Sequence, residues 1–141
     1  MNEIKKEYSF GMIFGVFDGL HPGHVYFVNE ALKKCEHLTV VVTQTLMVEI
    51  LKKKTPKYSL EERMSRLKKL NENLSVIPGD KMLGEWTVLK ENRIDIVFLG
   101  YDQQGIAREL DKMTKPYIFL PAYYPEKYKS SLYEKNEDIV Y

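Results

Sequence analysis

Cysteine, histidine and long apolar runs are all scarce in this sequence of 141 residues. The one cysteine, Cys35, excludes an intramolecular disulfide and a cysteine-rich zinc site, and three histidines leave little material for a metal cluster. The longest apolar runs, Leu38 to Val42 and Ile94 to Leu99, are far shorter than the roughly 20 residues that a membrane-spanning helix needs. No apolar stretch of signal-peptide length precedes the first strand-like run. We therefore expect a soluble protein of the cytoplasm that has no membrane partner.

The sequence also lacks an excess of charge of one sign. It has 21 Lys and Arg against 20 Asp and Glu, a net charge of +1, whereas proteins that bind nucleic acids usually carry a strong basic excess. A nucleic acid is therefore not expected as a partner. The charge is unevenly spread, since residues 1–70 hold 12 basic and 8 acidic side chains. Lys52, Lys53, Lys54 and Lys57 contribute to this local excess, either as a solvated surface run or as a phosphate-binding loop.

Apolar stretches of strand length alternate with helix-like segments along the chain. The predicted strands are Tyr8–Phe14, Leu38–Val42, Leu74–Ile77, Ile94–Leu99 and Pro116–Leu120. The predicted helices begin at about Pro22 and at Ser59, cover Met82–Glu91 and Ile106–Lys112, and include a weak helix near Ser130, while residues 44–57 are predicted as a loop or a short helix. This alternation favours right-handed crossovers and a parallel sheet covered on both faces. We expect a single α/β, Rossmann-like domain over residues 1–141, with a five-stranded parallel sheet.

Polar segments follow four of the predicted strands. They are GVFDGLHPGH from Gly15, TQTLMVEILKKK from Thr43, GYDQQG from Gly100 and PAYYPEKYKSS from Pro121. Open parallel sheets bind ligands beyond the carboxyl ends of their strands, near the point where the strand order reverses. All four segments would lie on that edge, where they can form one site.

His21 and His24 are the sharpest candidates for chemistry in these segments. They lie three residues apart at the expected start of a helix, so both imidazoles can face one ligand. Backbone N–H groups and the helix dipole favour an anion there, and Gly23 lets a ligand approach the backbone closely. Two imidazole donors at such a helix end suit the charge that develops on a phosphate during displacement at phosphorus. Two alternatives stay open: a zinc site, for which no third ligand stands at metal spacing, and a structural cap without a ligand.

The stretch from Gly15 to His24 resembles the G-x-F-D-x-x-H-x-G-H signature of the nucleotidyltransferase superfamily. That superfamily includes cytidylyltransferases, several adenylyltransferases and FAD synthases, and the resemblance extends from Gly11 to about Glu134. Three further details are similar to the archaeal type of FAD synthase, an FMN adenylyltransferase. They are LGYDQ at Leu99–Gln103, Lys52 ahead of a proline-containing loop and the E-x-R of Glu61–Arg63, and Tyr123 with the pair Ser130 and Ser131.

The resemblance implies transfer of a nucleoside monophosphate from a nucleoside triphosphate to a phosphate monoester, with release of pyrophosphate. ATP is the implied donor, FMN the implied acceptor, and FAD the product. His21, His24 and Lys52 are the implied catalytic residues, with Lys52 neutralising the leaving pyrophosphate. The implied nucleotide-binding residues are Val16 and Phe17 through their backbones, His21, Gly23, His24, Gly100, Asp102, Tyr123, Ser130 and Ser131. Mg²⁺ or another divalent cation would bind mainly through the nucleotide phosphates, with no metal-ligating side chains.

Three departures from the family pattern leave alternatives open. Val16 replaces a common hydroxyl residue, Thr45 stands where relatives often have aspartate, and the R-x-E-G-I-S-T-T run of cytidylyltransferases is absent. The alternatives are a cytidylyltransferase acting on glycerol 3-phosphate, a sugar-phosphate adenylyltransferase of cell-surface precursor synthesis, and a nucleotide-binding module without catalysis. Asp18 is expected to fix the turn rather than to act as a base.

The aromatic residues outside the motif carry the weaker expectations. Tyr101, Tyr123 and Tyr124 are candidates for stacking on a flavin ring, or else ordinary surface or core residues. Trp86 is expected within an amphipathic helix, as a core residue or part of a partner surface. A homodimer is expected, with the contact supplied by Met82–Trp86 or by the tyrosine-rich C-terminal segment.

Overall fold

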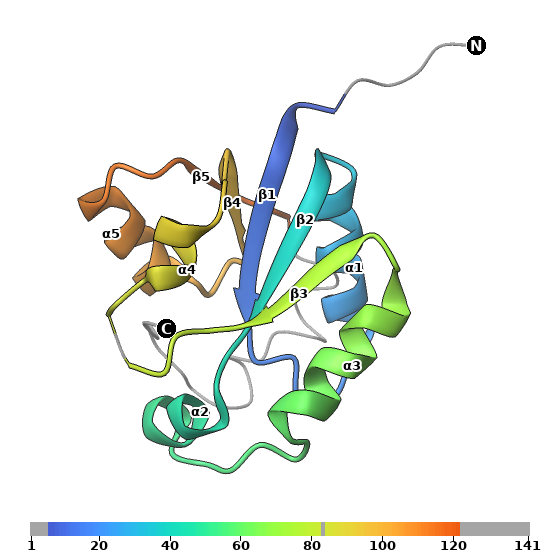
Figure 1. The fold of residues 1–141 in the computed structure, drawn as a ribbon, viewed down its shortest axis with the longest axis vertical. Coiled ribbons are helices and arrows are strands. Elements are labelled where there is room, and N and C mark those ends of the chain that lie inside the picture. The colour runs from blue at the N-terminus through green and yellow to red at the C-terminus, as the bar shows by residue number, and fades with distance from the viewer. Residues whose placement is uncertain (1–5, 83, 122–141) are drawn as a thin grey trace.

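A five-stranded parallel sheet forms the centre of the structure (Figure 1). This computed structural model describes residues 6–82 and 84–121. The strands are β1 (Tyr8–Gly15), β2 (Cys35–Val42), β3 (Leu74–Pro78), β4 (Ile96–Leu99) and β5 (Tyr117–Phe119). The helices are α1 (Pro22–Leu32), α2 (Thr45–Lys52), α3 (Leu60–Leu70), α4 (Thr87–Glu91) and α5 (Gln104–Lys112). The α/β class and the five parallel strands predicted from the sequence are confirmed.

The strand order is β3-β2-β1-β4-β5. The chain begins at the central strand, adds β2 and β3 on one side, and then crosses back to add β4 and β5 on the other. The order therefore reverses between β1 and β4. This place is the topological switch point, where a parallel sheet of this kind binds its ligand.

The two faces of the sheet are covered by different helices. Side chains alternate along a strand, so Ile13 of β1 packs with α1 and α3, whereas Met12 and Phe14 pack with α4 and α5. Val28 and Ala31 of α1 and Leu67 of α3 are buried on the first face, and Val88, Leu89, Ile106 and Leu110 of α4 and α5 on the second. Because both faces are covered, the buried parts of the central strands are apolar, as in Met12–Phe14 of β1 and Val40–Val42 of β2.

Most element boundaries lie within three residues of the predicted ones, and α4 is the exception. The predicted helix from Met82 begins five residues later, at Thr87. Trp86 has a left-handed backbone (φ +54°), which no α-helix accommodates, and Asp80 Oδ2 accepts a hydrogen bond from the N–H of Thr87 at 2.6 Å. The chain therefore makes a turn where the sequence predicts a first helical turn. The weak helix predicted near Ser130 lies outside the described residues.

The region predicted as a loop or short helix, residues 44–57, contains α2. This helix lies beyond the carboxyl ends of β1 and β2 (Figure 1), with Met47 and Val48 turned inward and Leu46 and Ile50 exposed. None of the helices in residues 6–82 and 84–121 has the length and apolar character needed to span a membrane.

Candidate active site

Two histidines cap the start of α1. His21 precedes the helix, and its Nδ1 accepts hydrogen bonds from the backbone N–H groups of Gly23 (3.0 Å) and His24 (3.4 Å). The Nδ1 of His24 accepts in return from the backbone N–H of His21 at 3.4 Å. These reciprocal bonds form a capping box in which histidines stand in place of the usual Ser or Thr and Glu, and Pro22 fills the first helical position. The two rings stack with 3.7 Å between their centroids, so the box holds them together at the carboxyl edge of the sheet.

The environment keeps both imidazoles neutral. Burial lowers the pKa of His21 below its ordinary value. Burial also lowers the pKa of His24 to about 4, helped by repulsion from His21 and from Lys52 and opposed by the nearby backbone of Gly19. Because each Nδ1 accepts a hydrogen bond, the proton of each neutral ring is on Nε2. The pair therefore carries its ring protons on the two Nε2 atoms and has no full positive charge.

The loop between β1 and α1 is packed tightly against the end of its strand. Phe17 is only 4% exposed, although its backbone is left-handed at φ +51°. Its ring lies edge-on to His24, with 5.4 Å between centroids, and covers Gly15, where an added Cβ would lie 2.7 Å from a ring carbon. A non-glycine residue in this conformation costs about 1–3 kcal/mol, a strain that is typical of functional loops. The Phe17 ring thus packs against both Gly15 and His24 and fixes the position of the His24 ring.

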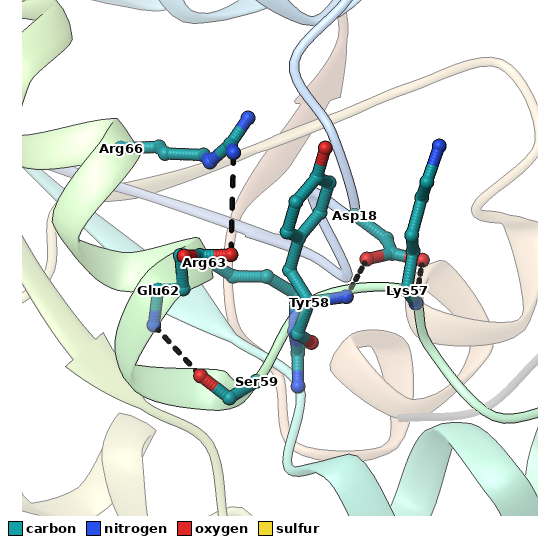
Figure 2. Close-up of polar contacts among 7 residues, drawn as sticks. All are labelled: Asp18, Lys57, Tyr58, Ser59, Glu62, Arg63 and Arg66. Carbon is teal, nitrogen blue, oxygen red and sulfur yellow. Dashed lines mark hydrogen bonds and ion pairs between the residues drawn. The ribbon is translucent and has the colours of Figure 1, made fainter.

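Asp18 ties this loop to the segment before α3 (Figure 2). Its two carboxylate oxygens accept hydrogen bonds from the backbone N–H groups of Lys57 (2.7 Å) and Tyr58 (2.9 Å). Both acceptor atoms are engaged by the protein backbone, so the carboxylate fixes the turn, as the sequence predicts.

Arg63 of α3 lies at the centre of the loops and is fully buried. Its Nη1 donates to the carbonyls of Val16 (3.1 Å) and Thr43 (2.7 Å), its Nη2 to the hydroxyl of Thr45 (3.0 Å), and its Nε to the carbonyl of Tyr58 (3.1 Å). Burial lowers its pKa from a very high ordinary value, against the attraction of Asp18 and Glu61, so the guanidinium stays charged. All four partners are neutral oxygens, and they belong to the loop after β1, to the segment from the end of β2 to the first residue of α2, and to the segment before α3. One cation therefore joins three segments of the carboxyl edge.

Lys52 ends α2, beyond the carboxyl ends of the strands. Its charge lowers the pKa of His24, which places the ammonium group within electrostatic range of the histidine pair. Lys53, the next residue, has a left-handed backbone at φ +56° and ends the helix, and Lys53 and Lys54 are exposed. Of the lysine tract, Lys52 is thus the member brought toward the histidines.

The loop after β4 meets β1 on the other side of the switch point. Gln103 is 9% exposed; its Oε1 accepts from the N–H of Gly100 (3.0 Å) and its Nε2 donates to the carbonyl of Phe14 (2.8 Å). Asp102 is exposed, and its Oδ1 lies 3.3 Å from where a Cβ on Gly100 would stand. Gln103 therefore fixes the loop to the central strand, and Asp102 stands at the edge beside it.

The comparisons with known proteins decide the family. Residues 12–135 match the family model described as cytidylyltransferase-like. The chain belongs to the cytidylyltransferase-like family. The superfamily predicted from the signature at residues 15–24 is thereby confirmed.

Curated relatives within this group are FAD synthases of archaea. The chain is 38% identical over 101 residues to the FAD synthase of Aciduliprofundum boonei, a match that covers 72% of this chain and 66% of the relative. It is 36% identical over 89 residues to that of Thermococcus sibiricus, covering 63% of this chain and 60% of the relative. The chain thus matches less than two thirds of the length of these two relatives.

Solved structures agree on the fold. The chain superposes on the lipopolysaccharide core biosynthesis protein of Thermoplasma volcanium with a TM-score of 0.71 and 26% identity, over 82% of this chain and 98% of that one. A bifunctional NMN adenylyltransferase/ADP ribose pyrophosphatase of Francisella tularensis gives a TM-score of 0.65 at 13% identity, over 91% of this chain and 41% of that one, which shows a shared fold alone.

The cytidylyltransferase-like site gathers most of its predicted residues at one edge. The capping box brings His21, Gly23 and His24 together, and Lys52 lies within electrostatic range of it. Gly100 and Asp102 stand across the switch point, on the loop after β4. The predicted Tyr123, Tyr124, Ser130 and Ser131 lie outside the described residues.

Two residues that organise this edge carried no predicted role. In the sequence Arg63 stands only within the E-x-R likeness, and Gln103 only within LGYDQ. Both act on partners far along the chain: Arg63 bonds Val16, 47 residues away, and Gln103 bonds Phe14, 89 residues away. The one sequence signal for Arg63 is its position on the apolar stripe of the predicted helix, three residues after Leu60 and four before Leu67.

Residues 6–82 and 84–121 contain no group of three His, Cys, Asp or Glu side chains that would hold a metal ion. The histidine pair uses both Nδ1 atoms for backbone caps, which fits a cap and a donor pair better than a zinc site.

Proposed function

We propose that this protein is a nucleotidyltransferase that transfers AMP from ATP to the phosphate of FMN, forming FAD and pyrophosphate. The two stacked histidines at the start of α1 are the observation that carries the proposal. They lie at the helix end and beside the switch point, where an α-phosphate would meet the Nε2–H groups of both rings and the helix dipole. The identity to archaeal FAD synthases supports ATP and FMN as the substrate pair.

The proposed reaction is an in-line displacement at phosphorus. An oxygen of the FMN phosphate attacks the α-phosphorus of ATP, a new P–O–P bond forms, and the bond from the α-phosphorus to the bridging oxygen of pyrophosphate breaks. The attacking phosphate is already ionised near neutral pH, so no protein base is needed, in keeping with an Asp18 carboxylate that is engaged by backbone N–H groups. Catalysis then consists of positioning and of stabilising the charge on the non-bridging oxygens.

The side chains have separate tasks in this proposal. His21 and His24 donate from Nε2 to the phosphate oxygens, and neutral donors fixed in advance need no reorganisation in the transition state. Lys52 offsets the charge of the leaving pyrophosphate. Asp102, on the loop held by Gln103, meets the ribose or the base, while the backbone N–H groups of the Val16–Phe17 loop face the phosphates. Tyr123, Ser130 and Ser131 are proposed to line the far side of the nucleotide.

A divalent cation, Mg²⁺ in the simplest case, would enter with the triphosphate and offset its charge. The described residues offer no cluster of ligating side chains, so the phosphate oxygens are its proposed ligands. The protein's own part is to hold the phosphates at the helix end.

The test is a comparison of histidine variants in a coupled pyrophosphate assay with ATP and FMN. Replacing His21 or His24 by alanine should lower kcat by about 100-fold or more, the usual loss for one oxyanion-type donor. His37 is the matched control, since it lies at the other end of the sheet, where its ring stacks on Phe10. Turnover of either variant within tenfold of the wild type would refute the assigned roles.

A second candidate is nucleotidyl transfer to a sugar phosphate, and one observation favours it. The Thermoplasma volcanium structure, named a lipopolysaccharide core biosynthesis protein, matches this chain over 98% of its own length. A panel of ATP or CTP with FMN, glycerol 3-phosphate and heptose phosphates separates the candidates, because pyrophosphate forms only with the true pair. Nucleotide binding without turnover on the whole panel would instead favour a binding module.

We also propose a single cytoplasmic domain that acts as a homodimer. Of the segment expected to supply the contact, Met82 is 65% exposed whereas Trp86 is 5% exposed, so Trp86 itself is a core residue and no partner surface. Sedimentation equilibrium on the full chain tests the dimer.

A further inference from the structure

Gln103 joins the two strands that meet at the topological switch point. The ladder between β1 and β4 extends only to Met12, whereas the ladder between β1 and β2 continues to Gly15. Beyond Met12, the Nε2 of Gln103 donates to the carbonyl of Phe14 at 2.8 Å. A side chain from the loop after β4 thus takes over the connection to β1 where the strand pairing ends.

The other polar groups of Gln103 hold the loop after β4 in a tight turn. The backbone N–H of Gln103 donates to the carbonyl of Gly100, and its Oε1 accepts from the N–H of Gly100, both at 3.0 Å. The carbonyl of Gln103 accepts from the N–H of Ala107 at 3.2 Å, at the start of α5. This one residue therefore fixes the turn of residues 100–103, the start of α5 and the distance of both from β1.

Glutamine is an unusual residue at this position of a helix. Gln103 directly precedes α5, where serine, threonine, aspartate and asparagine are preferred because their short side chains cap the helix. The side chain of Gln103 makes no such cap; it is buried and reaches the central strand instead. The length of glutamine therefore suits the connection to β1 rather than the cap.

The turn presents Asp102 at the carboxyl edge of the sheet. Asp102 is one of its central residues, and its Oδ1 lies 3.3 Å from the place where a Cβ on Gly100 would stand. The carboxylate therefore lies back over Gly100, whose N–H is bound by Gln103. Phe14, the other partner of the Gln103 amide, lies two residues before Val16. The amide thus links the loop of Asp102 to the strand that leads into the Val16–Phe17 loop.

A nucleoside triphosphate would contact the protein on both sides of this link. In the proposed function its phosphates lie at the start of α1 and its nucleoside lies at Asp102, so the nucleotide spans the switch point. The binding of a ligand that spans two loops depends on the distance between them, whereas the binding of a ligand that contacts one loop does not.

Resting on the proposed function, we infer that Gln103 is a positioning residue for the donor nucleotide, because it sets the distance between Asp102 and the phosphate site at α1. It acts through its two partners, the N–H of Gly100 and the carbonyl of Phe14, which engage both polar atoms of its amide. Loss of the link weakens binding of the whole nucleotide and leaves the phosphate site intact.

The test compares a ligand that spans the switch point with one that does not. Gln103→Met keeps the length of the side chain but loses both hydrogen bonds of the amide. In calorimetric titrations with Mg²⁺, this variant should bind ATP about tenfold more weakly than the wild type, and bind inorganic tripolyphosphate, which carries phosphates alone, equally well. The same change for both ligands, including no change for either, would overturn the inference.

A second variant guards against a failure of Gln103→Met to fold. Gln103→Asn keeps the amide on a side chain one methylene shorter, so the bond to Phe14 is out of reach. Asparagine is also a preferred residue before a helix, which supports the start of α5. This variant should show the same selective loss of ATP binding, and wild-type affinity for ATP in Gln103→Asn would count against the link.

Gln44 offers a matched control on the other side of β1. It also directly precedes a helix, α2, makes no side-chain cap, and donates from Nε2 to a carbonyl of a neighbouring segment, that of Gly79, at 3.0 Å. This bond joins the segment after β2 to the end of β3, away from β4. Gln44→Met should leave the binding of both ligands unchanged. A loss of ATP binding equal to that in Gln103→Met would overturn the inference, since any bond between loops would then have the same effect.

The inference and the proposed function fail in different ways. FAD formation, together with equal affinity for ATP in Gln103→Met and the wild type, would overturn the inference and leave the proposed function standing. No FAD from ATP and FMN, together with a selective loss of ATP binding in Gln103→Met, would overturn the proposed function and support the inference. A wild type that binds tripolyphosphate but not ATP would overturn both.

Discussion

The imidazole rings of His21 and His24 stack with 3.7 Å between their centroids, and each Nδ1 accepts a hydrogen bond from the backbone at the start of α1. The same pair is thus both the structural cap and the donor pair of the proposed site. The two sequence interpretations, a cap without a ligand and a phosphate-binding pair, are compatible because they use different atoms of the same rings: Nδ1 caps the helix, and Nε2 is the proposed donor to the ligand.

This division of roles predicts that His21→Ser separates stability from activity. Serine is among the best N-cap residues, so the hydroxyl should replace Nδ1 and keep the free energy of unfolding within about 1 kcal/mol of the wild type. The Nε2 donor is lost, so kcat should fall by about 100-fold or more. Urea denaturation and the pyrophosphate assay on one preparation measure both. A serine variant that keeps full activity would show that the ring serves the cap alone.

The lowered pKa of His24 predicts that acid destabilises the fold. Its pKa is about 4 in the folded chain and 6.5 in the ordinary case, so between these values the unfolded chain binds more protons than the folded one. Stability therefore falls as the pH drops through this window, by at most about 1.4 kcal/mol per pH unit from this group. Urea denaturation of the wild type and of His24→Gln checks it, because the glutamine variant lacks the titrating group and should show a shallower slope. Parallel slopes would contradict the buried, neutral histidine.

The burial of Arg63 predicts that replacing Arg63 or Arg66 of α3 by alanine lowers the free energy of unfolding by very different amounts. Arg63→Ala leaves buried carbonyls without donors and should lower the free energy of unfolding by about 3 kcal/mol or more. Arg66, one turn along, is the matched control: its side chain is exposed, stacks on Tyr58 and lies 4.0 Å from Glu62 (Figure 2), so Arg66→Ala should cost about 1 kcal/mol or less. Equal losses in the two variants would mean that Arg63 does not join the loops.

The contacts of Asp18 predict a positioning role that a pH profile distinguishes from general-base catalysis. Asp18→Asn keeps one side-chain acceptor for the N–H groups of Lys57 and Tyr58, and should lower kcat by less than about tenfold without changing the shape of the profile. Loss of an acidic limb from the profile of kcat, or a fall beyond about 100-fold, would instead assign the carboxylate to proton transfer.

The strands and the histidine turn could be read from the sequence because both depend on local patterns. Apolar runs such as Leu38–Val42 are typical of buried strands, and Pro22 after His21 marks a helix start. Arg63 and Trp86 depend on what the fold brings beside them. The partners of Arg63 lie up to 47 residues away, and the left-handed turn at Trp86 overrides an amphipathic pattern that predicts a helix from Met82. No propensity encodes either arrangement, since tertiary contacts decide both.

The most direct measurement of the central claim is the amount of FAD formed from ATP and FMN with Mg²⁺, resolved by chromatography beside the pyrophosphate released. We expect FAD and pyrophosphate in equal amounts from the wild type, and a loss of both by about 100-fold or more in His21→Ser and His24→Gln but not in His37→Ala. Pyrophosphate release that requires a sugar phosphate or glycerol 3-phosphate, with no FAD from FMN, would contradict the account.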